Sequence, residues 1–279
     1  MSDQEPLHIA KPAWLKTPIP SGETYFNIKR DLRDRKLYTV CEEAKCPNIA
    51  QCWNTNTATF MVLGDTCTRG CRFCNVKTGN PDGWLDPKEP DQVAESARLM
   101  KLKYVVITMV DRDDLADGGA AHVKQVVQTV HEANPGIKIE LLAGDFRGSD
   151  EALMKILSAT PEVYAHNVET IERLTPRVRD ARAGYRQSLS VLKRTKELAP
   201  SNILTKSALM LGLGEEILEV EAALRDLREH DVDRVTIGQY AKSIGFKAAV
   251  SGPLVRSSFR AREFYEEATG SHIVGNDKA

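Results

Sequence analysis

Residues 59–74 read Thr-Phe-Met-Val-Leu-Gly-Asp-Thr-Cys-Thr-Arg-Gly-Cys-Arg-Phe-Cys, an apolar stretch followed at once by three cysteines. The stretch from Thr59 to Leu63 is short and apolar, which predicts a buried β-strand. Cys67, Cys71 and Cys74 follow it, with three and then two residues between them. In α/β proteins, sites lie at the carboxyl ends of parallel strands. These cysteines therefore mark a candidate metal site at such an end.

Five more strands are predicted along the chain, and helical patterns separate them. The expected strands cover residues 104–110, 138–143, 163–168, 204–211 and 234–239, and the expected helices cover 91–102, 119–133, 150–158, 184–198 and 216–230. Strands and helices in alternation indicate a parallel sheet with right-handed crossovers. Periodicity alone leaves two architectures open, an open partial barrel and a doubly wound sheet. Before them, Tyr25, Ile28 and Leu32 share one side of a short helical pattern in an N-terminal extension.

The composition is that of a folded protein without a strong global charge. The chain has 279 residues, of which 42% are hydrophobic and 28% charged, and its formal net charge is -1. That balance gives no reason to expect nucleic acid or a membrane surface as a partner. No apolar run approaches the roughly 18 residues of a membrane span. Residues 1–10 lack the pattern of a signal peptide, so we expect a cytoplasmic protein.

All six cysteines lie between Cys41 and Cys74, which favours metal binding over a disulfide framework. The first triplet is Cys41-x4-Cys46-x5-Cys52. Three thiolates on a four-iron cluster leave one iron open to another ligand. Zinc, in contrast, prefers four Cys or His ligands. The six histidines lie outside residues 41–74, so a zinc site would need a distant histidine, and this alternative stays open.

The second triplet, with Phe73 before its last cysteine, resembles the signature loop of radical S-adenosylmethionine enzymes. This resemblance implies a four-iron cluster at Cys67, Cys71 and Cys74 whose open iron binds S-adenosylmethionine.

The chain as a whole is similar to the lipoyl synthase family. The similarity rests on the first triplet, Cys41-Glu-Glu-Ala-Lys-Cys46-Pro-Asn-Ile-Ala-Gln-Cys52, and on motifs at 58–64, 111–115, 166–170, 238–240 and 252–261. It implies a second, auxiliary four-iron cluster on Cys41, Cys46 and Cys52. The family's capping segment appears here as Arg256-Ser257-Ser258-Phe259. The resemblance makes Ser258 the fourth ligand of the auxiliary cluster and Arg256 its catalytic neighbour.

The same resemblance implies an α/β fold, a partial (β/α)6 barrel of radical S-adenosylmethionine type with N- and C-terminal extensions. We divide the chain accordingly into an N-terminal extension with the auxiliary-cluster cysteines at 1–58, a barrel core at 59–246 and a C-terminal extension with the capping segment at 247–279. The family has a Pro- and His-containing loop after the position of Tyr240. This chain is shorter there by roughly twenty residues, a length typical of a functional loop.

Several polar residues near predicted strand ends are candidates for binding S-adenosylmethionine. Asn167 and Glu169 share a face at the end of the fourth strand, and the resemblance assigns them to the ribose and methionyl groups. A helix cap and a surface salt bridge are the structural alternative. The further candidates are Thr108, Asp113 and Lys206, for which ordinary loop polarity is the alternative, and the aromatic Phe73 of the signature loop.

The activity that the resemblance implies is insertion of two sulfur atoms, at C6 and C8 of a protein-bound octanoyl group. The auxiliary cluster would donate the sulfur. The implied partners are an octanoylated carrier domain, of the dehydrogenase E2 or glycine-cleavage H protein type, an electron donor such as ferredoxin or flavodoxin, and a carrier that repairs the cluster. Two alternatives remain, a methylthiotransferase and a non-enzymatic iron–sulfur or zinc protein. Basic residues within 170–200 indicate either a solvated face or a docking site for an acidic carrier.

Overall fold

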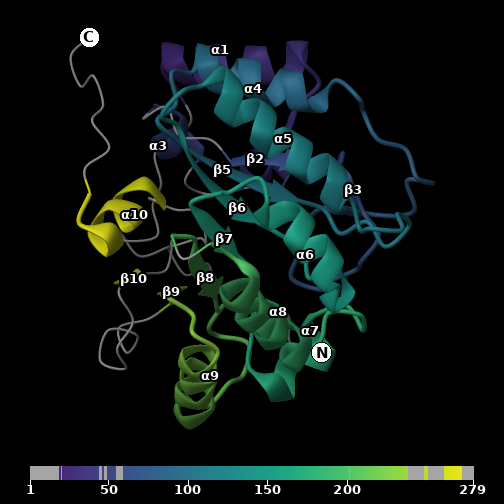
Figure 1. Ribbon diagram of the computed structural model, residues 1–279, viewed down its shortest axis with the longest axis vertical. Helices are drawn as coiled ribbons and strands as arrows, with labels where there is room; N and C mark the ends of the chain where they lie inside the picture. Colours follow the sequence, from purple (N-terminus) through teal and green to yellow (C-terminus); the bar gives the residue numbers. More distant parts are fainter. Residues whose placement is uncertain are drawn as a thin grey trace, which may run out of the picture.

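The computed structural model describes residues 19, 21–43, 46, 49–54, 59–200, 202–237, 248–250 and 261–271 (Figure 1). Its main feature is an eight-stranded sheet in the order β1-β2-β5-β6-β7-β8-β9-β10. The strands are β1 (Tyr38–Thr39), β2 (Thr59–Val62), β5 (Tyr104–Met109), β6 (Lys138–Leu142), β7 (Val163–Ala165), β8 (Leu204–Ala208), β9 (Arg234–Thr236) and β10 (Ala248–Val250). All neighbours pair in parallel except the edge strand β1, which is antiparallel to β2.

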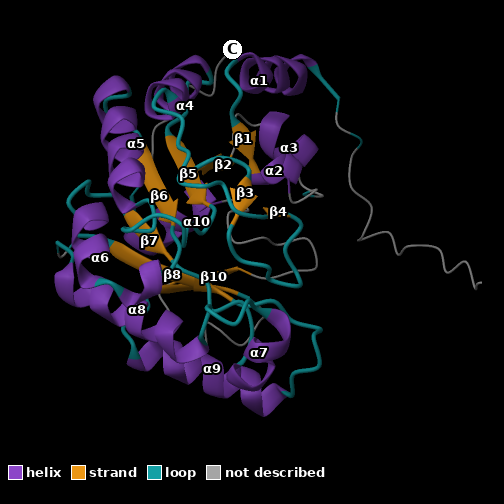
Figure 2. Cartoon of the chain, turned by 90° about the vertical axis from the view of Figure 1, so that its right-hand side faces the viewer, coloured by secondary structure: helices purple, strands orange, loops and turns teal. Residues whose placement is uncertain are grey.

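The strand order decides between the two architectures that periodicity left open. From β2 to β10 the strands lie side by side in the order of the chain. A doubly wound sheet reverses its order at a switch point, and this sheet has no such reversal among its described strands. The partial barrel is therefore confirmed, as an open sheet with β1 and β10 at its edges. Figure 2 shows the sheet curving, with helices along its outer side.

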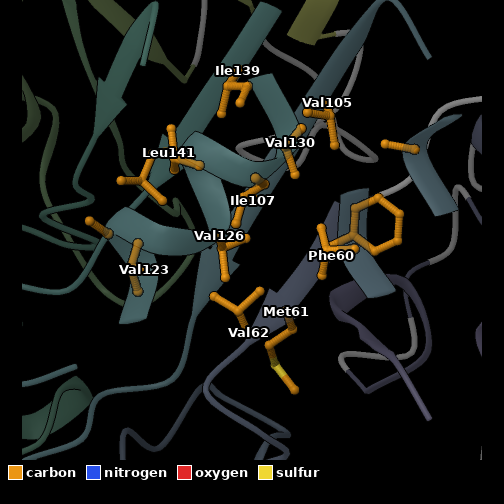
Figure 3. Packing of buried hydrophobic residues seen from close by; sticks show 14 of the residues in the cluster. Phe60, Met61, Val62, Val105, Ile107, Val123, Val126, Val130, Ile139 and Leu141 are labelled. Carbon is orange, nitrogen blue, oxygen red and sulfur yellow. The ribbon is translucent and has the colours of Figure 1, made fainter. Parts of the chain in front are cut away.

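Helices cover the outer face where the sequence predicts them. They are α4 (Glu89–Leu99), α5 (Ala120–Ala133), α6 (Asp150–Leu157), α8 (Tyr185–Leu198) and α9 (Ile217–Glu229). Between α5 and the sheet lies a core of fully buried side chains, among them Phe60, Val105, Ile107, Val126 and Ile139 (Figure 3). Each such aliphatic or aromatic side chain contributes about 1.5–3 kcal/mol by leaving water. Because strand residues alternate, Tyr104 and Glu140, the neighbours of Val105 and Ile139, face the barrel interior. Lys206, whose Nζ contacts Glu140, lies on the same side.

Smaller elements surround the barrel, towards both ends of the chain and within its loops. Helix α1 (Glu23–Asp34) buries Tyr25, Ile28 and Leu32, as its pattern predicts. The sequence did not predict α2 (Val40–Glu43), α3 (Ile49–Asn54), the short sheet of β3 (Thr66–Cys67) and β4 (Lys77–Thr78), α7 (Thr175–Val178), β10 or α10 (Ala261–Thr269). Helix α10 packs against β5, where the ring centroid of Tyr265 lies 5.6 Å from that of Tyr104. Tyr104 begins β5, so α10 lies at the amino end of that strand.

All six predicted strands end earlier in the structure, by one to three residues. The fourth ends at Ala165 instead of Val168, and the fifth ends at Ala208 instead of Leu211. Glu169 has a φ of 66°, in the left-handed region, and only an isolated bridge joins it to Leu209. The backbone thus leaves the regular sheet here, and residues 166–170 follow β7 outside the named strands. Within the part of the chain that the structure describes, none of the helices has the length and apolar character needed to cross a membrane.

Candidate iron–sulfur and cofactor site

The second cysteine triplet lies in a loop that begins at the end of β3. The backbone N–H of Arg69 donates to Cys67 Sγ at 3.4 Å, and that of Asp180 donates to Cys71 Sγ at 3.3 Å. Such hydrogen bonds favour thiolate sulfur and are typical of the surroundings of iron–sulfur clusters. The loop therefore has the donor set that a cluster needs, three free cysteines with N–H groups directed at two of them.

The thiols of this triplet influence one another, which places them in one neighbourhood. Burial raises the pKa of Cys67 to about 11, and the charges of Asp111 and Cys74 add to the effect. Burial also raises the pKa of Cys74, with contributions from Glu169 and Asp111. Anionic groups that oppose thiolate formation favour a bound cation, because a coordinating metal deprotonates a thiol. Asp111 and Glu169 thus lie close to the cysteines that the sequence assigns to a cluster.

In the first triplet, Cys41 lies on α2, Cys52 lies on α3, and Cys46 lies between these two helices. Cys41 is buried and its carbonyl accepts from the N–H of Cys46 at 3.0 Å. Burial, together with the charges of Cys41, Cys46 and Glu263, raises the pKa of Cys52 to about 12. The three thiols therefore share a neighbourhood, and the start of α10 lies next to it.

A hydrogen bond joins the two cysteine regions. The side-chain amide of Asn75, the residue after Cys74, donates to the carbonyl oxygen of Glu43, two residues after Cys41, at 2.8 Å. The two triplets are 15 residues apart in the sequence, from Cys52 to Cys67, and this contact brings their flanking segments together in space.

Asn167 and Glu169 lie side by side at the end of β7. Asn167 Nδ2 donates to Glu169 Oε1 at 3.0 Å. Asn167 Oδ1 is buried and has no hydrogen-bond partner within the described ranges, and an unsatisfied buried acceptor costs free energy until a donor reaches it. Burial raises the pKa of Glu169, which the hydrogen bond from Asn167 and the charge of Arg179 partly offset. An open acceptor and a carboxylate beside Cys74 fit a polar, cationic cofactor such as S-adenosylmethionine.

The other predicted cofactor residues contact protein groups. Thr108 Oγ1 donates to the carbonyl oxygen of Leu142 at 3.1 Å, and Lys206 Nζ lies 2.7 Å from Glu140 Oε1 with both side chains 1% exposed. Asp113 binds Arg69 at 2.9 Å. Phe73 is 39% exposed beside the loop. Their assignment to the cofactor stays a prediction.

The capping residues Ser258 and Arg256 lie outside the described residues, as does most of the predicted C-terminal extension. Across the described ranges, no three Cys, His, Asp or Glu side chains form a group that would hold a single metal ion. A four-iron cluster is larger than one ion, so its thiolates lie farther apart.

Sequence reasoning missed the residues that support the cysteine loop. Arg69 is buried and binds Asp113 and Asp145, while Asp180 accepts from the N–H of Gly70 at 2.9 Å. The position of Arg69 between two cysteines could have indicated this support, because a charged residue at the centre of a metal-binding loop needs a partner of opposite charge. Within the basic run at 170–200, Arg179 is buried and donates to Ser188 Oγ. That side chain is structural and does not form part of a solvated face.

Comparisons with known proteins show which family the chain resembles over most of its length. Residues 61–238 match the model of the radical SAM superfamily, and residues 2–46 match that of the N-terminal domain of lipoyl synthase. The chain is 48% identical to a lipoyl synthase of Thermus thermophilus, over 95% of this chain and 90% of that protein. It is 51% identical to a mitochondrial lipoyl synthase of Eremothecium gossypii, over 92% of this chain and 77% of the relative. A solved structure of methylornithine synthase aligns with a TM-score of 0.52 at 16% identity, over 78% of this chain and 61% of that one. This last likeness concerns the fold alone.

Proposed function

The chain belongs to the lipoyl synthase family of the radical S-adenosylmethionine superfamily, and from this we propose that its two cysteine triplets hold two clusters with different tasks. The reaction of the family is the insertion of two sulfur atoms, at C6 and C8, into an octanoyl group carried by a protein. Family membership favours this reaction over the two alternatives, methylthio transfer and a non-enzymatic role.

The side chains of this chain cannot open the C–H bonds at C6 and C8 by acid–base chemistry, so the reaction depends on cofactors. When bound, the clusters and S-adenosylmethionine supply the radical chemistry and the sulfur. Membership of the superfamily implies one four-iron cluster and S-adenosylmethionine. The second cluster, and the residues that bind each group, are part of our proposal.

We assign the radical-generating cluster to Cys67, Cys71 and Cys74. Their support is the pair of N–H groups directed at Cys67 Sγ and Cys71 Sγ. Asn167 and Glu169 would bind S-adenosylmethionine, Asn167 through its open Oδ1 and Glu169 through its carboxylate. Phe73, Thr108, Asp113 and Lys206 stay weaker candidates, because three of them already have protein partners.

We assign the auxiliary cluster to Cys41, Cys46 and Cys52, with Ser258 as the fourth ligand and Arg256 beside it. Ser258 stands three residues before Ala261, so covalent geometry limits the separation of their Cα atoms to about 11 Å. Helix α10 begins at Ala261, and the charge of its Glu263 acts on Cys52. A serine oxygen is a harder ligand than thiolate and binds iron less durably, which suits a cluster that gives up sulfur.

The single observation that carries the two-cluster proposal is the hydrogen bond from Asn75 to Glu43, which joins the segments that flank the two triplets. A substrate carbon activated at one cluster must meet sulfur from the other, so the two cysteine regions must lie close together.

We further infer that the substrate is an octanoylated carrier domain, of the dehydrogenase E2 or glycine-cleavage H protein type. Lipoyl synthases act on carrier-bound chains in general. The reaction also needs an electron donor, for which ferredoxin or flavodoxin is suited, and a carrier that rebuilds the auxiliary cluster after turnover.

The test is to replace each triplet with alanine in anaerobically prepared protein and to measure iron, sulfide, S-adenosylmethionine cleavage and lipoyl product. Without Cys67, Cys71 and Cys74, we expect half of the iron to be lost and cleavage to stop. Without the first triplet, cleavage should continue while sulfur insertion stops.

Ser258→Ala should keep near-normal iron, because thiolates provide most of the affinity, and should lose sulfur insertion. Ser257→Ala is its matched control and should be milder. Lipoyl product from the variant that lacks the first triplet would show that the auxiliary cluster is not the sulfur donor.

A further inference from the structure

Arg69, between the first two cysteines of the cluster loop, has its side chain enclosed by three aspartates. We call Asp111, Asp113 and Asp145 the carboxylate cage. The first two follow β5 and the third follows β6. The side chain of Arg69 is 2% exposed, although the loop around it reaches the surface. A charge buried to this degree requires a partner of the opposite sign, because removing it from water is otherwise costly.

The cage satisfies the guanidinium through two double contacts. Nε and Nη2 of Arg69 donate to the two oxygens of Asp113 at 2.9 and 3.0 Å. Nη1 and Nη2 donate to the two oxygens of Asp145 at 2.8 Å each, and Asp111 Oδ1 lies 3.6 Å from Nη1. Two such forks need the planar geometry of arginine, and a lysine ammonium cannot reproduce them.

The cage is itself held in place from several directions. Asp145 is fully buried and also accepts from Gln187 Nε2 at 2.7 Å. Asp113 also accepts from Thr68 Oγ1 at 3.1 Å and from Arg147 Nε at 3.0 Å. A network whose members are all partnered in this way fixes one conformation.

The anchored side chain controls a backbone group that contacts a cluster ligand. The N–H of Arg69 donates to Cys67 Sγ, and the carbonyl oxygen of Arg69 accepts from Thr78 Oγ1 at 3.4 Å. If the guanidinium left the cage, the peptide at Arg69 would be free to turn and this N–H···S bond would weaken. Hydrogen bonds to the sulfur ligands are one of the factors that set the reduction potential of an iron–sulfur cluster.

We propose that Arg69 is a positioning residue, which through the carboxylate cage holds the Cys67–Cys71 turn in its cluster-binding shape and tunes the reduction potential of the cluster bound there. The proposal rests on the proposed function in one respect, the assignment of a cluster to Cys67, Cys71 and Cys74. The anchoring of the turn concerns the protein alone.

The main variant is Arg69→Lys, which keeps the charge and loses the forks. Its matched control is Arg72→Lys in the same loop, because the side chain of Arg72 is exposed. Asp113→Asn serves as a second variant if Arg69→Lys does not fold. It disrupts the double contact between Arg69 and Asp113 and leaves the double contact between Arg69 and the buried Asp145 in place.

The first measurement is hydrogen exchange of the full chain over residues 66–79, before and after iron and sulfide are added. We expect exchange at least tenfold faster in Arg69→Lys and in Asp113→Asn than in the wild type, and unchanged exchange in Arg72→Lys.

The second measurement is the midpoint potential of the cluster, followed by electron paramagnetic resonance in protein that lacks the first triplet. The potential should fall in Arg69→Lys, because the N–H···S bond stabilises the reduced cluster, which has more negative charge on its sulfur, and a weaker bond stabilises that reduced state less. It should stay unchanged in Arg72→Lys.

Wild-type exchange or a wild-type potential in Arg69→Lys would overturn the proposal, as would equal effects in the two lysine variants. If the wild-type loop holds no cluster at all, the proposed function fails, while the exchange of the metal-free chain still reports on the anchoring of the turn.

Discussion

The buried ion pair between Lys206 and Glu140 allows a quantitative test of the barrel interior. Lys206 Nζ lies 2.7 Å from Glu140 Oε1, both side chains are 1% exposed, and the hydroxyl of Tyr104 donates to Glu140 Oε2 at 2.8 Å. Lys206→Met keeps much of the side-chain volume and removes the cation. Because a buried carboxylate then loses this partner, we expect the free energy of unfolding to fall by about 3–5 kcal/mol.

The double variant Lys206→Met/Glu140→Gln separates the charge from the packing. It removes both charges, and the amide oxygen of glutamine can still accept from Tyr104. Replacing a buried pair with neutral groups is often close to neutral for stability, so we expect most of the loss to be recovered. Lys138→Met is the control, because its pair with Glu162 at 3.1 Å is partly exposed. Such a pair contributes about 1 kcal/mol or less.

The assay is urea unfolding under anaerobic conditions, with the free energy obtained by linear extrapolation. A loss below about 1 kcal/mol in Lys206→Met, or a double variant as unstable as the single one, would refute the reasoning from burial. The same variant tests the prediction that Lys206 binds S-adenosylmethionine. If Lys206 contacts S-adenosylmethionine, the affinity of the folded Lys206→Met protein for this cofactor should fall. If Lys206 acts only within the protein, that affinity should be unchanged.

Three shorter predictions concern other described residues. Burial lowers the pKa of His166 to about 4, so acidification from pH 6.5 to 4 protonates the unfolded chain first and lowers stability, by roughly 3 kcal/mol from this group. Burial raises the pKa of Asp111 to about 6, and this group therefore stabilises the folded chain on acidification over the same range. To isolate His166, the free energy of unfolding in urea is measured for wild type and His166→Gln at pH 7 and pH 4. An equal loss of stability in the two proteins between these pH values would contradict the prediction. In Gly144→Ala the new Cβ would overlap Asp111 Oδ1, and we expect the free energy of unfolding to fall by about 1–3 kcal/mol in the same assay. An unchanged free energy would contradict this expectation. Asn167→Ala and Glu169→Ala should each raise the dissociation constant of S-adenosylmethionine by roughly 5- to 150-fold in equilibrium dialysis, and an unchanged constant would remove them from the cofactor site.

The sequence predicts the barrel well because its evidence is periodic. Each of the six predicted strands is a short apolar run, and each predicted helix has one apolar side that packs on the sheet. The short elements have no such signal. Strand β3 is two residues long, and α2 has four residues, so their conformation depends on tertiary contacts that no local pattern encodes. Strand β10 and α10 lie beyond Tyr240, where the alternation of predicted strands and helices that guided the prediction ends.

The cysteines were predictable as ligands, whereas their supporting network was not. The spacing of Cys67, Cys71 and Cys74 is local and visible in the sequence. Arg69 binds Asp145, which stands 76 residues later, and only the folded sheet brings β5 and β6 to the same loop. A sequence can show that a buried arginine needs a carboxylate, but many aspartates in this chain are available to provide it.

The depth of a residue in the barrel explains why Thr108 and Lys206 bind protein groups while Asn167 keeps an open acceptor. The register pairs Thr108 with Leu142, Leu142 with Ala165, and Ala165 with Lys206, so Thr108 and Lys206 belong to one layer of the interior. Asn167 lies two residues beyond Ala165 and so belongs to the next layer towards the carboxyl ends, where the cysteine loop lies. Glu140 lies two residues before Leu142, in the layer below. Lys206 therefore binds Glu140 in the layer below, while Asn167 keeps an open acceptor beside Glu169, whose charge acts on Cys74. The position of a residue along its strand is visible in the sequence, but its layer depends on how neighbouring strands are staggered. The layer in turn decides whether a polar side chain contacts other protein groups or is open to a ligand.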